Sequence, residues 1–287
     1  MRLALRSLAL LCGAFVASAP LSLNAEQMYV TNGGSLTRFD SNNPSSLSSS
    51  TYQGLQAGET IIGLDLRPAN GVLYGISSAS RLYAIDPASG AVTAIGSAGA
   101  FTLNGTAFGI DFNPVPDRLR FVSNTEQNLR INPNDGTAII DGALNPAGNI
   151  VAVAYSNNFA GAASTVLYAI DSVAGTLNII SNPNAGGPIN VVGSLGLGMN
   201  LDERIGFDIS GLTGTAYASI NIGGFTNLYT INLDTGAASL VGSIGGPGNN
   251  FLGLTAASTI PEPSTYMLLG AGALLVVAGY RRRRARI

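Results

Sequence analysis

The chain has 287 residues, a formal net charge of −2, no histidine and no lysine, and only 10% of its residues are charged. Its single cysteine, Cys12, lies near the amino terminus. This composition excludes Ser-His-Asp, Cys-His and Ser-Lys nucleophilic sites and typical zinc or copper centres, so carboxylates are the remaining catalytic or ligating groups.

Residues 1–25 are typical of a secretory signal peptide. Arg2 and Arg6 precede an apolar stretch from Leu8 to Val16, and small residues follow up to Ala25. We expect export through the Sec machinery and cleavage after Ala25. Cys12 lies in the removed segment, so the mature body is predicted to have no cysteine and to be held together by its apolar core.

The part of the chain from Glu26 to Glu262 is acidic. It contains seven arginines and sixteen Asp or Glu residues, which gives a net charge near −9. Because such a surface repels phosphate backbones, nucleic-acid binding is disfavoured, whereas contact with cations or neutral glycans is permitted.

The body, residues 26–258, is predicted to be all-β. Short runs alternate apolar with small or polar residues, and each is bounded by Gly, Pro, Asn or Asp, a pattern typical of strands. Such runs occur at Gly71–Ile76, Arg118–Val122 and Thr215–Ile220. The 37 glycines favour tight turns and crowded strands over helices.

Two phrases repeat along this body. In the first, Asp or Asn stands four residues before Gly, which predicts a strand, a turn capped by the Asp or Asn side chain, and a second strand. Its copies are Leu82–Gly90, Leu129–Gly136, Leu167–Gly175 and Leu228–Gly236. The second phrase lies upstream of each copy, at Ile62–Leu66, Phe108–Phe112, Ile205–Ile209 and, in degenerate form, Val151–Tyr155. The resulting period of roughly 40 to 60 residues is expected of propeller blades.

The two ends of the body supply a fifth unit. Met28–Thr31 and Leu36–Asp40 match later strands of a unit but lack its first strand, which reappears as Phe251–Thr255. We therefore predict a five-bladed β-propeller of four-stranded blades, closed by strands from both termini so that no edge stays open. The Gly- and Asn-rich stretch from Pro183 to Asp202 could hide an additional strand pair.

This pattern of Leu-Tyr-Ala-Ile-Asp repeats resembles an uncharacterised family of secreted bacterial domains, known only as a domain of unknown function. The resemblance implies a propeller-like fold over nearly all of the mature chain. The resemblance does not indicate any active-site residues, and a fold alone does not specify a function.

Three aspartates, Asp65, Asp111 and Asp208, occupy the same position of the second phrase. Since the first strand of each blade borders the central channel, their side chains could converge on a metal. Calcium takes six to eight oxygen ligands, which three carboxylates with backbone carbonyls and water could provide. Alternatively, each Asp caps the turn leading to Pro68 or Pro114. Ala154 and Thr255 at the matching positions break a five-fold ring of carboxylates.

Glycines share a strand face with these aspartates, at Gly63, Gly109 and Gly206, where the missing side chain would let backbones crowd the axis. Asp234-Thr235-Gly236 mimics an aspartic-protease loop, but such a site needs two copies, and this one lies in the repeated turn phrase.

Other side chains at strand positions favour packing over binding. The chain has no Trp, which gives poor support to a sugar-stacking cleft, although paired carboxylates roughly 5 to 10 Å apart could cleave glycosides. Four tyrosines are expected to pack between blades: Tyr74, Tyr83, Tyr168 and Tyr229. Arg118 and Arg120, close to Asp117, favour a solvated face or a blade-to-blade ion pair over an anion site.

Residues 259–287 form a third region. Pro261, Glu262, Pro263 and Ser264 precede an apolar run of 15 residues from Tyr266 to Tyr280, and the chain then continues with Arg281, Arg282, Arg283, Arg284 and Arg286. The run predicts a transmembrane helix of about 22 Å, short of the roughly 30 Å hydrocarbon core. The arginine cluster predicts retention in the cytoplasm, with the body on the far side of the membrane.

This order of motif, apolar segment and arginine cluster resembles the PEP-CTERM sorting signal of Gram-negative bacteria. The resemblance implies recognition of the motif by an exosortase, transient residence in the inner membrane and removal of the tail. It further implies a destination in the cell envelope, on the cell surface or in the extracellular matrix of a biofilm-forming organism.

These observations together predict an exported, non-catalytic propeller that serves as a scaffold or binding module for exopolysaccharide or surface proteins. No cofactor is expected apart from calcium at the three aspartates. The alternative is a carboxylate-based enzyme, calcium-dependent if those aspartates bind the ion, that acts on extracellular glycans.

Overall fold

The structure is a computed structural model that describes residues 25–257. All but the last residue of the predicted signal peptide lies outside this range, as do the sorting motif, the predicted membrane helix and the arginine cluster. Among the described residues, no helix is both long and apolar enough to cross a membrane.

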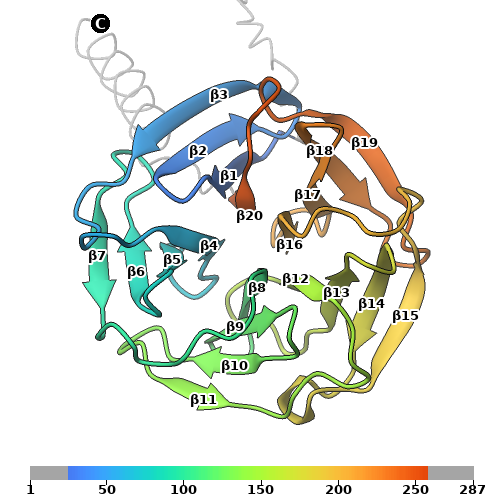
Figure 1. Ribbon diagram of the computed structural model, residues 1–287, viewed down its shortest axis with the longest axis horizontal. Helices are drawn as coiled ribbons and strands as arrows, with labels where there is room; N and C mark the ends of the chain where they lie inside the picture. Colours follow the sequence, from blue (N-terminus) through green and yellow to red (C-terminus); the bar gives the residue numbers. More distant parts are fainter. Residues whose placement is uncertain (1–24, 258–287) are drawn as a thin grey trace, which may run out of the picture.

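The described residues form five antiparallel sheets of four strands each, arranged around a central axis (Figure 1). Blade 1 consists of β20 (Leu252–Ala257), β1 (Gln27–Thr31), β2 (Ser35–Asp40) and β3 (Asn43–Thr51). Blade 2 consists of β4 (Ile61–Leu66), β5 (Leu73–Ser77), β6 (Leu82–Ile85) and β7 (Val92–Ile95). Blade 3 consists of β8 (Phe108–Asn113), β9 (Arg118–Ser123), β10 (Asn128–Ile131) and β11 (Ala138–Ile140). Blade 4 consists of β12 (Ile150–Tyr155), β13 (Leu167–Asp171), β14 (Thr176–Ile180) and β15 (Ile189–Ser194). Blade 5 consists of β16 (Ile205–Ile209), β17 (Ala216–Ile222), β18 (Phe225–Ile231) and β19 (Ala238–Ser243).

The ring is closed by strands from the two ends of the body. β20 pairs antiparallel with β1, and Gln27 lies opposite Ala257. In Figure 1 the red strand β20 lies inside the blue strands of blade 1, at the centre of the ring. The predicted five-bladed propeller with four-stranded blades is confirmed.

The stretch from Pro183 to Asp202 holds no additional strand pair. It contains one short 3-10 helix, η1 (Pro183–Ala185), and β15, which is the outer strand of blade 4. The suggestion of a hidden pair was wrong because the Asn- and Gly-rich residues form the turns on either side of an ordinary outer strand.

The turns of the first repeated phrase share one geometry. An Asp or Asn side chain accepts a hydrogen bond from a backbone N–H two or three residues further on, and the following Gly has a positive φ. The pairs are Asp86 with Ala88, Asn132 with Asn134, Asp171 with Ala174, and Asn232 with Asp234. The glycines are Gly90, Gly136, Gly175 and Gly236, with φ from 63° to 81°.

The apolar core lies between adjacent blades. Tyr74 of blade 2 packs edge-on against Phe112 of blade 3, with ring centroids 5.2 Å apart. One cluster contains Leu36 of blade 1 with Ile61 and Leu64 of blade 2. Since burial of each such side chain stabilises the fold by about 1.5–3 kcal/mol, neighbouring blades are held face to face around the ring.

Candidate functional site

The innermost strands of the blades, β4, β8, β12, β16 and β20, surround the propeller axis (Figure 1). A Cβ built on Gly63 would lie 2.3 Å from Ile110, and the Asp65 carboxylate, two residues on, contacts the backbone of Phe112. Neighbouring inner strands therefore run in the same direction and are very close together. Corresponding residues of the repeated phrase consequently meet at the same level of the axis.

Asp65, Asp111 and Asp208 do meet at one level, which we call the axial tier. One carboxylate oxygen from each lies within 4.8 Å of those of the other two. The three residues are 1, 0 and 1 % exposed, respectively. The structure thus brings together, out of contact with solvent, the three aspartates that the repeat alignment singled out.

Each carboxylate accepts a hydrogen bond from the backbone of the next blade. Asp65 Oδ2 lies 2.7 Å from the Phe112 nitrogen, and Asp111 Oδ2 lies 2.8 Å from the Tyr155 nitrogen. Asp208 Oδ2 lies 2.6 Å from the Ala256 nitrogen. The inner strands have a strand neighbour on one side only, so these carboxylates satisfy N–H groups that the sheets leave unpaired. The alternative in which each Asp caps the turn toward Pro68 or Pro114 was wrong, because the partners lie across the blade interface.

Thr255 continues this series in blade 1. Its Oγ1 accepts a hydrogen bond from the Leu66 nitrogen at 3.3 Å and lies 2.9 Å from Asp65 Oδ1 and 3.0 Å from Asp208 Oδ2. One hydroxyl has one proton, so Thr255 can donate to only one of the two carboxylates. The repeat alignment treated Thr255 as a break in the ring, although its matching position was a usable signal. Ala154, which has no side-chain oxygen, is the real interruption.

Two buried oxygens at the tier accept no hydrogen bond within the described part of the chain: Asp111 Oδ1 and Asn158 Oδ1. Asn158 follows β12, and its Nδ2 donates to Asp208 Oδ1 at 3.3 Å. Asn158 lies outside both repeated phrases, so its position beside the tier could not be predicted from the repeats.

Burial is the main influence on the pKa of each carboxyl group in the tier. It raises the pKa of Asp65 and Asp111 well above the ordinary value, and the neighbouring carboxylates raise both further. Burial also raises the pKa of Asp208, to about 6, against the opposing effect of its hydrogen bonds from Ala256 and Thr255. With no cation bound, the tier therefore resists carrying three negative charges at neutral pH.

The axis is closed beside the tier. A residual volume of about 10 Å³ lies between the inner strands, room for roughly one water molecule or ion. Beyond it, at the amino-terminal ends of the inner strands, a depression of about 310 Å³ opens, which we call the mouth. It is lined by Ile62, Thr106, Ala107, Phe108, Asp202, Glu203, Arg204, Ile205, Leu252 and Gly253.

Residues 35–255 match the family described as Domain of unknown function (DUF4394). The chain belongs to this family. Residues 259–284 of this DUF4394 protein match the PEP-CTERM protein-sorting motif, which marks it as an exosortase-sorted protein exported to the cell surface by way of the membrane. No curated protein matches the chain.

Three solved structures are similar to this DUF4394 chain. A protein of unknown function from Bacteroides thetaiotaomicron VPI-5482 is 14% identical, with a TM-score of 0.50 over 83% of this chain and 68% of that one. A putative 6-phosphogluconolactonase from Bacteroides uniformis ATCC 8492 is 14% identical, with a TM-score of 0.41 over 78% and 85%. A protein of unknown function from Bacteroides caccae is 9% identical, with a TM-score of 0.40 over 79% and 77%.

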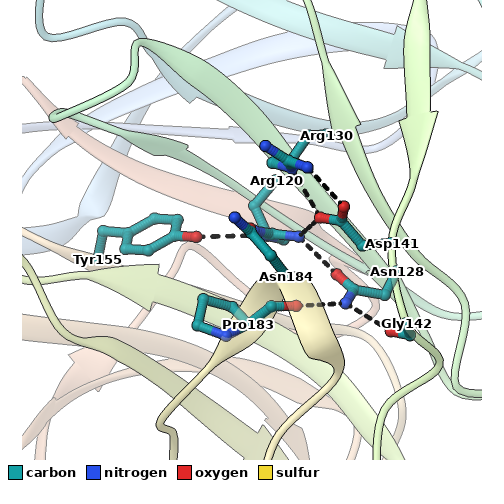
Figure 2. A network of polar contacts seen from close by, with 8 residues as sticks. All are labelled: Arg120, Asn128, Arg130, Asp141, Gly142, Tyr155, Pro183 and Asn184. Atoms are coloured by element: carbon teal, nitrogen blue, oxygen red, sulfur yellow. Dashed lines mark hydrogen bonds and ion pairs between the residues drawn. The ribbon is translucent and has the colours of Figure 1, made fainter.

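A second polar cluster of the DUF4394 propeller surrounds Arg120, which is fully buried (Figure 2). Its guanidinium donates to Asp141 and Asn128 within blade 3, at 2.6 and 2.8 Å. It also donates to Tyr155 and Asn184 of blade 4, at 3.1 and 2.7 Å. We call this cluster the Arg120 network.

The Arg120 network joins two blades through the hydrogen bonds to Tyr155 and Asn184, whereas its ion pair with Asp141 lies within blade 3. The Arg120 guanidinium is buried, so it does not face solvent as an anion site would require. Arg130 reaches the same carboxylate, Asp141, with two hydrogen bonds of 2.8 Å each. For Arg120 the expected solvated face was wrong because the side chain is buried, and the expected blade-to-blade ion pair was wrong because Asp141 belongs to the same blade. The acidic residue expected to pair near it, Asp117, is bound instead by Arg67 of blade 2.

We expect the stability of the cation-free protein to fall as pH rises from 4.5 to 7.5. A carboxyl group whose pKa is raised by folding binds more protons in the folded state than in the unfolded state, so its contribution is lost as pH increases. A loss of at least about 1 kcal/mol should appear in urea unfolding curves recorded with EDTA.

Carboxylates with lowered pKa, such as Glu59 and Asp202, have the opposite sign, but their contributions change mainly at and below the acidic end of this window. An Asp111→Asn variant should show a shallower slope because one of the three coupled groups is gone. If the free energy of unfolding of the wild-type protein stayed constant or rose between pH 4.5 and 7.5, the three carboxyl groups of the tier could not be buried without a compensating positive charge.

Proposed function

We propose that the mature DUF4394 propeller is a non-catalytic scaffold or binding module of the cell surface or extracellular matrix, delivered there by exosortase processing. The observation that carries this proposal is the burial of the axial tier. The candidate acid and base groups lie behind a closed axis, where a glycan chain could not reach them, and the composition offers no nucleophilic triad instead.

The course of the inner strands supports an oriented module. β20 ends at Ala257, beside Gln27, and the sorting motif begins two residues further on, at 259. The mouth lies at the opposite ends of the inner strands, lined by Leu252 at the start of β20. The described chain therefore ends at one end of the inner strands, and the mouth opens at the other end.

The mouth is suited to a small, neutral, hydroxyl-rich group. Its volume of about 310 Å³ is at the lower end of ligand pockets, and it combines apolar side chains such as Phe108 with polar ones such as Glu203 and Arg204. The acidic body disfavours polyanions. We take a neutral sugar unit of the producer's own exopolysaccharide as the ligand.

The experiment is a co-sedimentation assay of the processed protein, purified from its producing cells, with exopolysaccharide from the same cells. We expect saturable binding that an Arg204→Ala variant weakens at least about fivefold. The matched control is Arg118→Ala, which removes an arginine at the opposite end of the axis and should bind as the wild type does. No binding by the wild type, or equal loss in both variants, would overturn the mouth as the binding site.

The rival function, a carboxylate-based enzyme acting on extracellular glycans, makes a separate prediction. Such an enzyme would release new reducing ends from the exopolysaccharide, and Asp111→Asn and Asp208→Asn would each abolish the release. That result would overturn the non-catalytic proposal. Binding without release of reducing ends is the result that we expect.

A further inference from the structure

We propose that the axial tier is a binding site for one calcium ion, which joins blades 2, 3 and 5 at the propeller axis. The spacing of the carboxylates is the first argument. Two oxygens that each lie about 2.4 Å from one calcium ion can be no more than about 4.8 Å apart. One oxygen from each of Asp65, Asp111 and Asp208 satisfies this limit with respect to the other two.

The charge of the tier is not balanced by protein groups. The hydrogen bonds that the three carboxylates accept come from backbone N–H groups, from Thr255 and from Asn158, and none in the described range comes from an arginine. Three fully buried carboxylates without a cationic partner carry a large desolvation penalty. A divalent cation would remove most of it.

Asp111 supplies an independent indication of a ligand. Its Oδ2 is occupied by the Tyr155 N–H, whereas its Oδ1 is buried and accepts no hydrogen bond from any described residue. A buried oxygen of this kind normally has a hydrogen-bond or metal partner. The Asp65 and Asp208 carboxylates share the tier with Asp111 and cannot donate a hydrogen bond when ionised, so a cation is the partner that fits.

Asn158 adds a second free oxygen from outside the acidic cluster. Its Nδ2 contacts Asp208, which places the amide beside the tier, and its buried Oδ1 likewise accepts no hydrogen bond. A carboxamide oxygen is an ordinary calcium ligand. The hydroxyl oxygen of Thr255 lies 2.9 Å from Asp65 Oδ1 and 3.0 Å from Asp208 Oδ2, and its single proton can be donated to only one of these two carboxylates.

The donor set selects the class of metal. Every candidate ligand is a carboxylate, amide or hydroxyl oxygen, which suits calcium, magnesium or manganese and not zinc or copper. Magnesium demands near-octahedral geometry and usually keeps several of its water molecules, which a site formed by side chains that are 0–1% exposed does not favour. Calcium, which accepts an irregular set of protein oxygens, is therefore the ion of choice.

The test is a thermal melt of the processed protein after EDTA treatment and desalting, with and without 1 mM calcium chloride. We expect calcium to raise Tm by about 5–10 °C, and mass spectrometry under native conditions to find one calcium per chain. In Asp111→Asn, the calcium response should be lost. That variant should nevertheless melt at a higher temperature than the wild type in EDTA, because one of three mutually repelling charges is gone.

The matched control is Asp234→Asn, which removes an exposed carboxylate from a turn and should retain the full calcium response. Two results would overturn the proposal: an unchanged Tm of the wild type with no bound calcium, or an equal loss of the response in Asp111→Asn and Asp234→Asn. A response to magnesium equal to that to calcium would overturn the assignment of the ion.

Discussion

Replacement of Gly206 by alanine is expected to destabilise the propeller by more than about 3 kcal/mol or to prevent its folding. A Cβ at this position would lie 2.4 Å from the carbonyl carbon of Gly253 and 2.5 Å from the nitrogen of Leu254, both backbone atoms of the closing strand β20. Neither atom can move without displacing the strand that completes the ring. Urea unfolding followed by circular dichroism measures the effect.

Two other glycines provide a graded control. Alanine at Gly63 would meet the end of the Ile110 side chain, which can change rotamer, so we expect a smaller cost of about 1–3 kcal/mol. Alanine at Gly246 would meet nothing within 4 Å, and its effect should stay within about 0.5 kcal/mol. If Gly206→Ala were as stable as Gly246→Ala, the inner strands could not be as close as described.

The second large effect is expected at Arg120. An Arg120→Leu variant should lose about 3–5 kcal/mol, because Asp141, Asn128 and Asn184 would all lose a buried donor (Figure 2). The same unfolding experiment measures it. Arg118→Leu, two residues earlier on the same strand, should lose less than about 1 kcal/mol, since Arg118 reaches only the carbonyls of Pro116 and Asp117.

A double variant separates charge from packing in the Arg120 network. If the cost arises because the buried Asp141 carboxylate keeps Arg130 as its only cationic partner, Arg120→Leu combined with Asp141→Leu should be more stable than Arg120→Leu alone. Additive losses in the double variant, or equal losses at Arg118 and Arg120, would contradict an inter-blade network centred on Arg120.

The architecture was predictable because the repeated phrases fix the place of each strand in its blade. The unit at the amino terminus lacks its first strand, and the strand at Phe251–Thr255 has no unit of its own, so the two were predicted to form one blade. The pairing of β1 with β20 confirms this prediction. The outer strands were harder to predict from the sequence. β15 lies in a stretch rich in Gly and Asn, and none of its residues is buried, so it lacks the alternation of apolar residues that marks a strand with one buried face.

The tier was predictable for the same reason, since equivalent positions of neighbouring blades converge on the axis. The hydrogen bonds of the tier were not predictable from the repeats. Asp65, Asp111 and Asp208 each accept a hydrogen bond from a backbone N–H of a different blade, which the pattern within one blade does not indicate. The residues that complete the two polar clusters, Asn158 and Asn184, lie in connections between strands, outside the repeats. Their positions follow from the paths of those connections, which alternation and turn patterns do not specify.

The most direct test is a crystal structure of the processed protein grown with calcium chloride, with anomalous differences recorded at long wavelength. We predict one anomalous peak on the propeller axis, about 2.3–2.6 Å from an oxygen of each of Asp65, Asp111 and Asp208. No peak, with Asp111 Oδ1 hydrogen-bonded to a water molecule or to a protonated neighbouring carboxyl group, would contradict a cation-centred axis.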